Sequence, residues 1–327
     1  MNMAKVIRWG MVGTGDVTEI KSGPGFYKAN HSMLYGVTNR TYEKAVDYAA
    51  RHGVEKVYSD IDEMIADGQV DAIYIATPPG SHKFYAQKCA DAKIPCYIEK
   101  PIAMSYEEHL ELIEMFEQAD TKAFAAYYRR GLPRFNKVKE LIETGVIGDV
   151  QFAHLSLYRP ASVDEMENKS WRIHPDVSGG GIFMDVGVHQ LDIMNYLLGN
   201  IIDVKCHVMN RGGFYEPEDS ISALMLFENG VYMSADWCFV AGYHQDEIKI
   251  VGSKGQVTLS CFGPDAPVVE SVNGNETHSV EHPEHVQQPL IQSIVDELNG
   301  SGQCPSNLKT SLQTAWVCEQ INHAYKK

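Results

Sequence analysis

A short apolar run that leads directly into a glycine-rich turn constrains the fold of this chain more than any other feature. Residues 6–9 precede the turn Gly10-Met11-Val12-Gly13-Thr14-Gly15-Asp16-Val17-Thr18. From there to about residue 127, short apolar runs alternate with segments of helical periodicity. This alternation is typical of a doubly wound α/β domain, in which each helix returns the chain to start another parallel strand.

The first half is therefore predicted to form one domain over residues 1–127. We expect strands at residues 6–9, 33–38, 72–76, 96–98 and 123–127, separated by helices at 42–52, 61–66, 82–92 and 106–118.

The second half, residues 128–327, has a different pattern. Strand-like runs at residues 150–158, 201–209, 221–227, 231–240, 247–251 and 256–261 are joined in places by tight-turn residues. Helical patterns occur after Pro133 and at residues 288–298 and 308–324. We expect a second α/β domain with a large, mostly antiparallel open sheet and helices on one face. The other face needs cover, which favours a homodimer or homotetramer.

Composition excludes several classes of protein. The 327 residues carry a formal net charge of −15 without a basic block, so nucleic acid is not expected as a partner. The seven cysteines include no C-x-x-C pair, which indicates free thiols in a reducing compartment. No apolar run is long enough for a membrane helix, and no signal peptide precedes the first strand. We expect a cytoplasmic protein.

The glycine turn predicts a dinucleotide site. Gly13 and Gly15, with Thr14, Asp16 and Val17 around them, supply the tight turn and close backbone approach that a pyrophosphate needs at a helix N-terminus. Thr18 replaces the third small residue of G-x-G-x-x-G, so somewhat looser packing is expected there.

The ends of the next strands refine the cofactor prediction. Asn39 and Arg40 stand where an acid would hold the ribose of NAD, and an arginine suits a 2′-phosphate, so NADP is favoured. NAD stays open, because an asparagine can still bind a ribose. Further on, Thr77 and Pro78 form a stiff loop against which a nicotinamide ribose could pack. His82 either joins that contact or only supports the loop.

Lys100 lies where the strand at residues 96–98 ends in Glu99-Lys100-Pro101. Ligands bind outside the carboxyl ends of the strands in an open parallel sheet, so Lys100 and Glu99 are predicted to face the cofactor crevice. The alternative is an ordinary surface Glu-Lys pair that closes a strand.

A second cluster follows three consecutive glycines at residues 179–181. Asp185 and His189 are four residues apart and share a helix face, and Asp192 lies one turn further on. A neutral histidine near pH 7 suits removal of a hydroxyl proton, and a nearby lysine would stabilise the resulting alkoxide. The alternative is a helical Asp with an internally bonded His, and Asp192 is interpreted as mostly structural.

These features together resemble the glucose-fructose oxidoreductase/inositol dehydrogenase (Gfo/Idh/MocA) family. The resemblance implies a Rossmann domain followed by an α/β domain whose open sheet often forms the oligomer contact. It also implies a catalytic triad of Lys100, Asp185 and His189, with His189 as general acid/base, acting on sugars, cyclitols and related compounds. Two departures are Thr18 and the break Ser22-Gly23-Pro24-Gly25 in the first helix.

Weaker candidates for substrate binding are Tyr128, at the predicted domain boundary, and Trp171 and Arg172, in the loop before the glycines. The neighbouring Arg129 and Arg130 suit either this site or an interdomain salt bridge. No metal site is expected, because His282, Glu284 and His285 fit a solvated acidic loop better.

The sequence thus predicts an NADP-dependent, or NAD-dependent, oxidoreductase of sugars or related alcohols. Two alternatives stay open: a hydrolase or lyase that retains its nicotinamide and oxidises the substrate transiently, and a sensor that binds dinucleotide without catalysis. A pure sensor needs no proton-transfer residues, so the Lys, Asp and His argue against it.

Overall fold

The structure, a computed structural model, describes residues 4–325, and the chain divides into two compact units. The first unit comprises Met1–Leu132 and Pro283–Leu312, and the second comprises Pro133–His282 and Gln313–Lys327. The sequence predicted a single boundary at 127/128, and it did not predict that a later segment of the chain returns to the first unit. Residues 283–312 join the first unit because apolar side chains of that segment are part of its core, namely Leu290, Ile291, Ile294 and Val295.

The first unit contains the predicted parallel sheet, with the strand order β3-β2-β1-β4-β5-β6. Its strands are β1 Ile7–Val12, β2 Ser32–Thr38, β3 Lys56–Val57, β4 Ala72–Ile75, β5 Cys96–Ile98 and β6 Ala123–Ala125. Its helices are α1 Asp16–Ile20, α2 Gly23–Lys28, α3 Tyr42–His52, α4 Ile61–Ala66, α5 His82–Asp91, α6 Tyr106–Gln118 and α11 Gln288–Leu298, with short 3-10 turns η1 Pro79–Ser81 and η2 Tyr128–Gly131. All strand pairs in this sheet are parallel, as a doubly wound fold requires.

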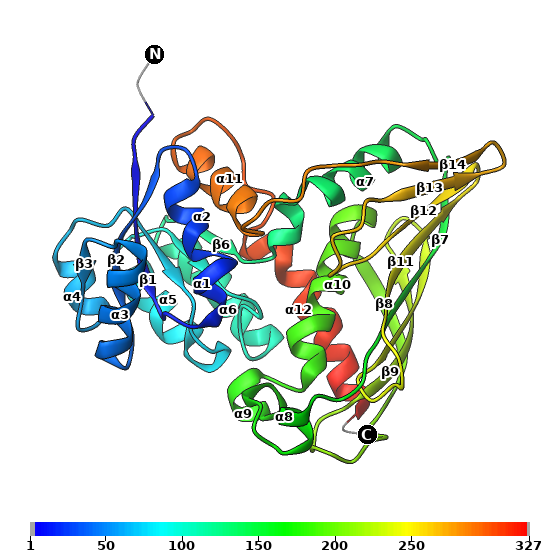
Figure 1. Ribbon diagram of the computed structural model, residues 1–327, viewed down its shortest axis with the longest axis horizontal. Coiled ribbons are helices and arrows are strands. Elements are labelled where there is room, and N and C mark those ends of the chain that lie inside the picture. Colours follow the sequence, from blue (N-terminus) through cyan, green and yellow to red (C-terminus); the bar gives the residue numbers. More distant parts are fainter. Residues whose placement is uncertain (1–3, 326–327) are drawn as a thin grey trace. The chain divides into compact units, whose positions relative to one another are not determined.

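An aromatic cluster lies in the core of this unit. Phe26 packs against Trp9, with ring centroids 4.9 Å apart, and against Tyr74, at 5.0 Å. Tyr74 in turn stacks on Tyr97 at 5.1 Å. Helix α11 lies beside α2, although more than 250 residues separate them in the chain (Figure 1). The large buried rings thus join β1, β4 and β5 to α2, and the ends of these strands form the predicted cofactor edge.

The second unit contains an eight-stranded sheet with the order β14-β13-β12-β11-β7-β10-β9-β8. Its strands are β7 Val150–Tyr158, β8 Ile201–Met209, β9 Ser220–Phe227, β10 Tyr232–Cys238, β11 Gln245–Gly252, β12 Gly255–Leu259, β13 Val268–Ser271 and β14 Gly274–Thr277. Its helical segments are α7 Pro133–Glu143, α8 Val163–Met166, η3 Trp171–Ile173, α9 Pro175–Ser178, α10 Ile182–Leu198 and most of α12 Leu308–Tyr325. Among the described strands of this sheet, only β7 and β10 pair in parallel, which confirms the mostly antiparallel sheet.

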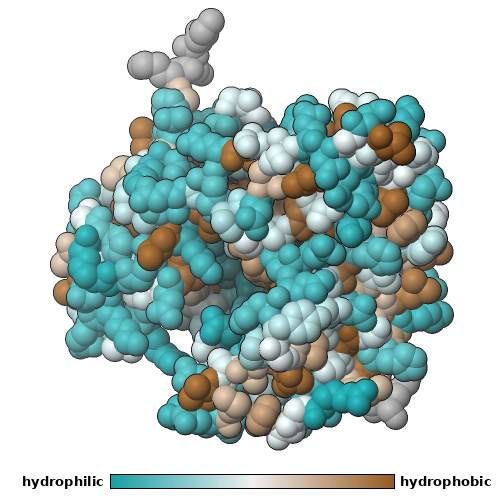
Figure 2. Space-filling model, turned by 45° about the vertical axis from the view of Figure 1, so that its right-hand side comes forward, coloured by the Kyte–Doolittle hydropathy of each residue, from teal (hydrophilic) through white to brown (hydrophobic). Residues whose placement is uncertain are grey.

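Helices α10 and α12 lie on one face of this sheet (Figure 1). Side chains alternate between buried and exposed positions along β9, because successive residues of a strand point to opposite faces. The uncovered face carries several exposed apolar side chains: Met209, Leu224, Leu226 and Tyr232. Figure 2, with this side of the molecule turned forward, shows hydrophobic residues interspersed among hydrophilic ones. None of the helices within residues 4–325 combines the length and the apolar character that crossing a membrane requires.

Candidate active site

The glycine turn has the geometry that a diphosphate requires. Gly13 has a φ of +96°, and a Cβ there would lie 2.7 Å from the carbonyl oxygen of Ala76. A Cβ on Gly15 would meet nothing within 4 Å, so there is open space over the residue that precedes α1. Gly15 caps α1 without a side-chain hydrogen bond, as expected for a helix N-terminus whose first backbone N–H groups serve a ligand. The turn therefore fits a dinucleotide.

Thr18 is not loosely packed, contrary to the expectation from the sequence. Its side chain is fully buried, and its hydroxyl donates to the carbonyl oxygen of Gly15 at 2.7 Å. The Tyr48 hydroxyl donates to the carbonyl oxygen of Thr18 at 2.9 Å. The threonine thus satisfies its own hydroxyl within the first turn and joins α1 to α3.

The break in the first helix has a packing role. A Cβ on Gly23 would lie 2.1 Å from both the Thr18 carbonyl oxygen and the Tyr48 hydroxyl, and one on Gly25 would lie 2.8 Å from Ile291. The chain therefore ends α1 and begins α2 where only glycine permits these close contacts. The break brings α2 against α3 and α11 and does not obstruct the glycine turn.

Asn39 ties the end of β2 to the glycine turn. Its side-chain N–H donates to the Thr14 hydroxyl at 2.8 Å, and its side-chain oxygen accepts from the backbone N–H of Thr41 at 2.9 Å. Arg40, the next residue, is exposed. Arg40 thus supplies a positive charge beside the glycine turn, in a chain whose net charge is −15.

Glu99 is the centre of a buried hydrogen-bond network at the end of β5. Its Oε1 accepts from the Tyr74 hydroxyl at 2.6 Å and from Nε2 of Gln287 at 2.7 Å, and its Oε2 accepts from the backbone N–H of Lys100 at 3.2 Å. The Tyr97 hydroxyl donates to Oε1 of Gln287 at 2.7 Å. Burial, together with the charge of Glu99, raises the pKa of Tyr74 well above its ordinary value. These bonds fix the backbone that carries Lys100.

His82 is a support for the loop after β4. Its side chain is fully buried, with Nε2 lying 2.8 Å from the Thr77 carbonyl oxygen and Nδ1 lying 3.0 Å from that of Pro101. Burial lowers the pKa of His82, whereas the hydrogen bonds to these carbonyl oxygens oppose the shift. The ring joins the Thr77–Pro78 loop to the chain just after Lys100, and it does not reach the surface.

Helix α10 carries the second group of candidate residues. It begins after Gly181, where a Cβ would lie 2.6 Å from the side chain of Pro217. Asp185 is half-buried and forms a 2.7 Å ion pair with Nε of Arg172. His189 is buried, and its ring lies edge-on to Phe262 with centroids 6.2 Å apart.

Asp192, one turn beyond His189, has a structural contact. It is buried, and its Oδ1 accepts from the Thr314 hydroxyl on α12 at 3.2 Å.

Trp171 is 41% exposed, and the guanidinium of Arg172 lies 4.9 Å from its ring centroid. Trp171 and Arg172 therefore lie together near the first turn of α10.

The residues at the predicted domain boundary belong to the first unit. Arg130 is buried and donates to the carbonyl oxygens of Pro305 at 3.0 Å and Thr310 at 2.8 Å. The guanidinium of Arg129 lies 4.8 Å from the ring centroid of Tyr128. Arg130 thus fastens the returning segment 283–312 to its own unit.

The loop with His282, Glu284 and His285 has no metal-binding arrangement. Lys28 lies 2.9 Å from Glu284 and 2.6 Å from Nε2 of His285, whose Nδ1 lies 2.7 Å from the carbonyl oxygen of Ile20. Across residues 4–325 there is no group of three or more His, Cys, Asp or Glu that could hold a metal ion.

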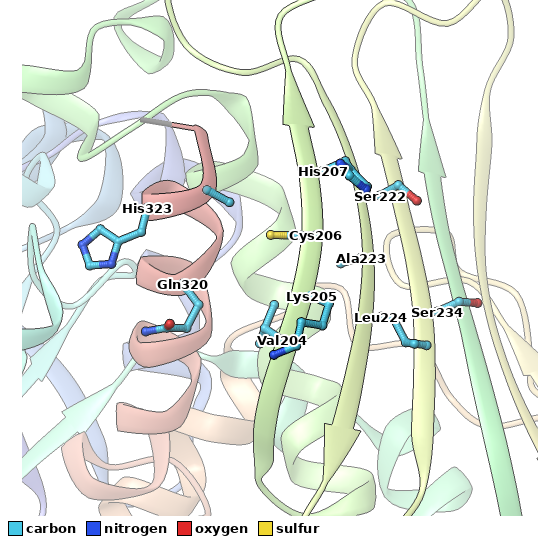
Figure 3. A pocket seen from close by; sticks show the side chains of 11 residues that line it. Val204, Lys205, Cys206, His207, Ser222, Ala223, Leu224, Ser234, Gln320 and His323 are labelled. Atoms are coloured by element: carbon cyan, nitrogen blue, oxygen red, sulfur yellow. The ribbon is translucent and has the colours of Figure 1, made fainter. Parts of the chain in front are cut away.

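A large cavity lies away from these residues. Its volume is 1040 Å³, and its lining comes from β8, β9, β10 and α12. Val204 and Cys206 lie on the side of β8 toward α12, which carries Gln320 and His323 (Figure 3). None of the predicted site residues lines it, so its size does not mark the reacting centre.

Several residues that contact the candidate site residues, in both units, were not identified from the sequence. Gln287 and Tyr74 donate hydrogen bonds to Glu99, although they lie 188 and 25 positions from it in the sequence. No local sequence pattern predicts such contacts. Phe262 lies 73 positions after His189 in a loop of ordinary composition. Only the positions of motifs, and not the neighbours that orient them, could be found in the sequence.

A parallel sheet with a glycine turn at the head of its first helix is typical of a dinucleotide-binding domain. The chain belongs to the Gfo/Idh/MocA family. Residues 7–127 match the model described as oxidoreductase family, NAD-binding Rossmann fold, and residues 135–258 match the GFO/IDH/MocA C-terminal domain. The family resemblance and the prediction of an NAD(P)-dependent dehydrogenase or reductase are thereby confirmed.

Known relatives and structures extend the likeness over most of the chain. Oxidoreductase P35 of Formosa agariphila is 36% identical, over 90% of this chain and 91% of that protein. D-xylose 1-dehydrogenase [NADP(+)] of Haloarcula marismortui is 27% identical, over 77% of this chain and 72% of that protein. The structure of levoglucosan dehydrogenase with NADH and levoglucosan matches with a TM-score of 0.88 and 20% identity, over 98% of this chain and 97% of that one. The last comparison concerns the fold alone.

Proposed function

We propose that this enzyme transfers a hydride between a nicotinamide cofactor and a hydroxyl- or keto-bearing carbon of a sugar, cyclitol or related compound. The observation that carries the proposal is the order of strands in the first unit, where β1, β4 and β5 are neighbours. Gly13, Thr77 and Lys100 follow these strands at one edge of the sheet, where ligands of such folds bind. The activity of the relative on D-xylose supports a sugar as substrate.

The glycine turn is proposed to hold the cofactor diphosphate. Gly13, Thr14 and Gly15 supply the close backbone approach, and Asp16 and Val17 supply N–H groups at the beginning of α1.

Further along the same edge, Thr77 and Pro78 are proposed to pack against the nicotinamide ribose, with His82 as the residue that fixes their loop. Glu99 acts on the site through the backbone of Lys100, because both of its oxygens accept hydrogen bonds inside the unit.

The proposed cofactor is NADP, with NAD as the alternative. Arg40 is exposed beside Asn39, and no acid stands there to repel a 2′-phosphate. Arg40→Ala should therefore weaken NADP binding by roughly 1.5–3 kcal/mol, the value of a charge-assisted hydrogen bond, and leave NAD binding nearly unchanged. Fluorescence titrations of both cofactors measure this. Equal losses for both, or a wild-type preference for NAD, would contradict the assignment.

The proton chemistry is assigned to side chains from both units. The nicotinamide, when bound, supplies or accepts the hydride. His189 takes the proton from the substrate hydroxyl, or returns it in the reverse direction, as a general acid/base near neutral pH. Lys100 stabilises the negative charge that develops on the substrate oxygen, and Asp185 completes the triad. Tyr128, Trp171 and Arg172 are proposed to bind the hydroxyl groups of the substrate.

The test is a panel of aldoses, cyclitols and sugar acids, followed by absorbance of the reduced nicotinamide with both cofactors. Turnover of at least one compound supports the proposal. A cofactor that survives extensive dialysis, in an enzyme that changes a substrate without net nicotinamide reduction, would instead indicate transient oxidation in a lyase or hydrolase. Dinucleotide binding without any chemistry would indicate a sensor.

The open face of the eight-stranded sheet is proposed to form a homodimer or homotetramer contact. Leu224 and Tyr232 are 53% and 50% exposed there, and burial of such side chains favours association. The seven free cysteines fit an enzyme of the reducing cytosol. Light scattering at micromolar concentration measures the assembly, and a monodisperse monomer contradicts it.

A further inference from the structure

Gln287 is a fully buried polar residue in the segment that returns to the first unit. It stands at the N-cap position of α11. Ser, Thr, Asp and Asn are preferred there, because their short side chains accept hydrogen bonds from the first N–H groups of a helix. The side chain of Gln287 makes no such cap. The helix therefore gives no reason for a glutamine at this position, and the reason lies in what its side chain contacts.

The two partners of this side chain fix the direction of its amide. An ionised carboxylate only accepts hydrogen bonds, so Glu99 requires the amide nitrogen, and Nε2 lies 2.7 Å from its Oε1. The amide oxygen is thereby directed at Tyr97, whose hydroxyl donates to it at 2.7 Å. Burial raises the pKa of Tyr97 well above its ordinary value, so this hydroxyl keeps the proton that it donates. Glutamine supplies both a donor and an acceptor, as these two partners require.

The backbone of Gln287 is held by the end of α1. Its N–H donates to the carbonyl oxygen of Lys21 at 3.0 Å. Two positions earlier, Nδ1 of His285 lies 2.7 Å from the carbonyl oxygen of Ile20. Helix α1 begins after the glycine turn, so the segment that contacts Glu99 is also bonded to the helix of the proposed diphosphate site. Gln287 thus relates the end of β5 to α1.

Tyr74 approaches the same carboxylate from β4. Its hydroxyl donates to Oε1 of Glu99 at 2.6 Å and lies 3.1 Å from Oγ of Ser22, which is fully buried just after α1. Oε1 is therefore bonded from two sides, whereas Oε2 accepts from the backbone N–H of Lys100 at 3.2 Å. A buried carboxylate that loses one of these donors must find another by turning. Such a turn displaces the N–H group that is bonded to its second oxygen.

We infer that Gln287 is a positioning residue of the proposed reaction, because it holds the Glu99 carboxylate in the orientation that places Lys100. The inference rests on the proposed function, in which Lys100 stabilises the charge on the substrate oxygen. Gln287 acts only through Glu99. A displacement of about 1 Å at a reacting group costs on the order of 10²-fold in rate. Loss of Gln287 should therefore affect turnover, whereas the glycine turn continues to bind the cofactor.

The experiment compares variants of the full-length enzyme. Gln287→Met has nearly the same length and loses both hydrogen bonds, and Gln287→Asn stays polar but draws the amide back from Glu99. Gln292→Met is the matched control on α11, because this glutamine accepts from the backbone N–H of Asn30 at 2.7 Å and donates to Asp296 at 2.9 Å. Tyr97→Phe removes the other partner of Gln287 and keeps the bond from Nε2 to Glu99.

Four measurements are made on each variant. Steady-state rates give kcat and KM on a substrate from the panel, and fluorescence titration gives the dissociation constant of the cofactor. Hydrogen–deuterium exchange, followed by mass spectrometry of overlapping peptides, reports on the backbone N–H of Lys100, which Glu99 binds. Thermal unfolding identifies the variants that are folded.

Gln287→Met and Gln287→Asn should lower kcat by roughly 10- to 100-fold, with faster exchange at the Lys100 amide and nearly unchanged cofactor affinity. Gln292→Met should leave all of these within about twofold of the wild type. Tyr97→Phe should lower kcat less than either Gln287 variant does. In a Lys100→Met background, Gln287→Met should cause little further loss, because the two residues act through one group.

Wild-type kcat in a folded Gln287 variant overturns the inference, as does an undiminished further loss in the Lys100→Met background, since a merely structural role would add independently. Faster exchange at the Lys100 amide, in an enzyme that turns over no compound of the panel, supports the positioning of Lys100 by Gln287 while contradicting the proposed function.

Discussion

Two buried glutamates, one in each unit, have surroundings of opposite character. Glu99, in the first unit, accepts hydrogen bonds from Tyr74, Gln287 and the backbone of Lys100. Glu218, in the second unit, is only 4% exposed, and its Oε1 has no hydrogen-bond partner within residues 4–325. Burial raises the pKa of Glu218 to about 7, and Asp219 adds to the shift, although the backbone N–H groups of Glu218 and Gly181 oppose it.

The comparison shows that burial alone does not decide what a carboxyl group does. At the end of β5, several donors converge on one carboxylate, and the result is a fixed support for Lys100. Next to Gly181, where α10 begins, burial without enough donors leaves a carboxyl that exchanges its proton near neutral pH. The first unit therefore presents its candidate residue on a rigid frame, whereas the beginning of α10 in the second unit is sensitive to pH.

The largest expected effect comes from removing one reacting side chain from each unit. His189→Ala and Lys100→Met should each lower turnover by roughly 10²- to 10⁴-fold, because general acid/base catalysis and oxyanion stabilisation are lost. The double variant should lose less than the product of the two, as residues that act in one transition state do. Steady-state rates and cofactor titrations measure these effects. Near wild-type turnover of His189→Ala, or loss of cofactor binding as its sole defect, would refute the assignment.

The rigid frame should be sensitive to loss of its central acceptor. Glu99→Leu leaves the Tyr74 hydroxyl and Nε2 of Gln287 buried without their acceptor, so the free energy of unfolding should fall by roughly 2–5 kcal/mol. Glu99→Gln is the control, since its amide oxygen still accepts hydrogen bonds and the loss should be smaller. Urea unfolding followed by fluorescence measures both. A stability of Glu99→Leu close to that of the wild type would mean that the network does not support the frame.

Glu218 should give the second unit a distinctive pH dependence. Its folded pKa of about 7 exceeds the ordinary value of 4.5, so the folded state retains a proton that the unfolded state has lost. Its contribution to stability is complete below pH 4.5 and declines as the pH rises through 7. Glu218→Gln should remove this decline, so its stability relative to the wild type should increase by roughly 2–3 kcal/mol from pH 5 to pH 8.

Thermal unfolding at several pH values measures this difference, and the control is Glu216→Gln, which changes an exposed carboxyl two residues away. Stability curves of Glu218→Gln and the wild type that run parallel from pH 5 to 8 would show that Glu218 does not titrate in this range.

The smallest effect is expected at Arg172. Its ion pair with Asp185 joins side chains that are 44% and 22% exposed, so solvent screens it. Arg172→Ala should change the free energy of unfolding by less than about 1 kcal/mol. Arg159→Ala offers the contrast, because Arg159 binds the buried Glu165 at 2.7 Å. A loss at Arg172 as large as that at Arg159 would mean that the loop before α10 is held as firmly as the frame around Glu99.

Local patterns were sufficient for most helices and strands. Tyr42–His52 was predicted with its observed bounds, because its apolar positions follow the helical period and Gly53 ends it in a left-handed conformation. Val150–Tyr158 alternates as a half-buried strand does. In contrast, β13 and β14 were missed. All residues of β14 are exposed, and this strand exists because it pairs with β13, so it has no hydrophobic pattern of its own.

The same distinction applies to the site. Lys100, Asp185 and His189 could be proposed because each lies in a recognisable motif at a predicted element boundary. Gln287 and Phe262 could not, because their contacts depend on packing between distant segments. The pKa of Glu218 depends on the depth of burial and on the number of nearby donors, neither of which the order of residues specifies.

The return of residues 283–312 to the first unit also affects the order of events during synthesis. The core residues Leu290 and Ile291 and the partner Gln287 leave the ribosome only after residues 133–282, about 150 positions, have been made. At roughly 5–20 residues per second, the first unit waits on the order of 10–30 s with its core incomplete. The second unit can begin to form its sheet during that interval. A nascent chain of this protein therefore exposes the uncovered side of α2 and β1 to chaperones for longer than a contiguous Rossmann domain would.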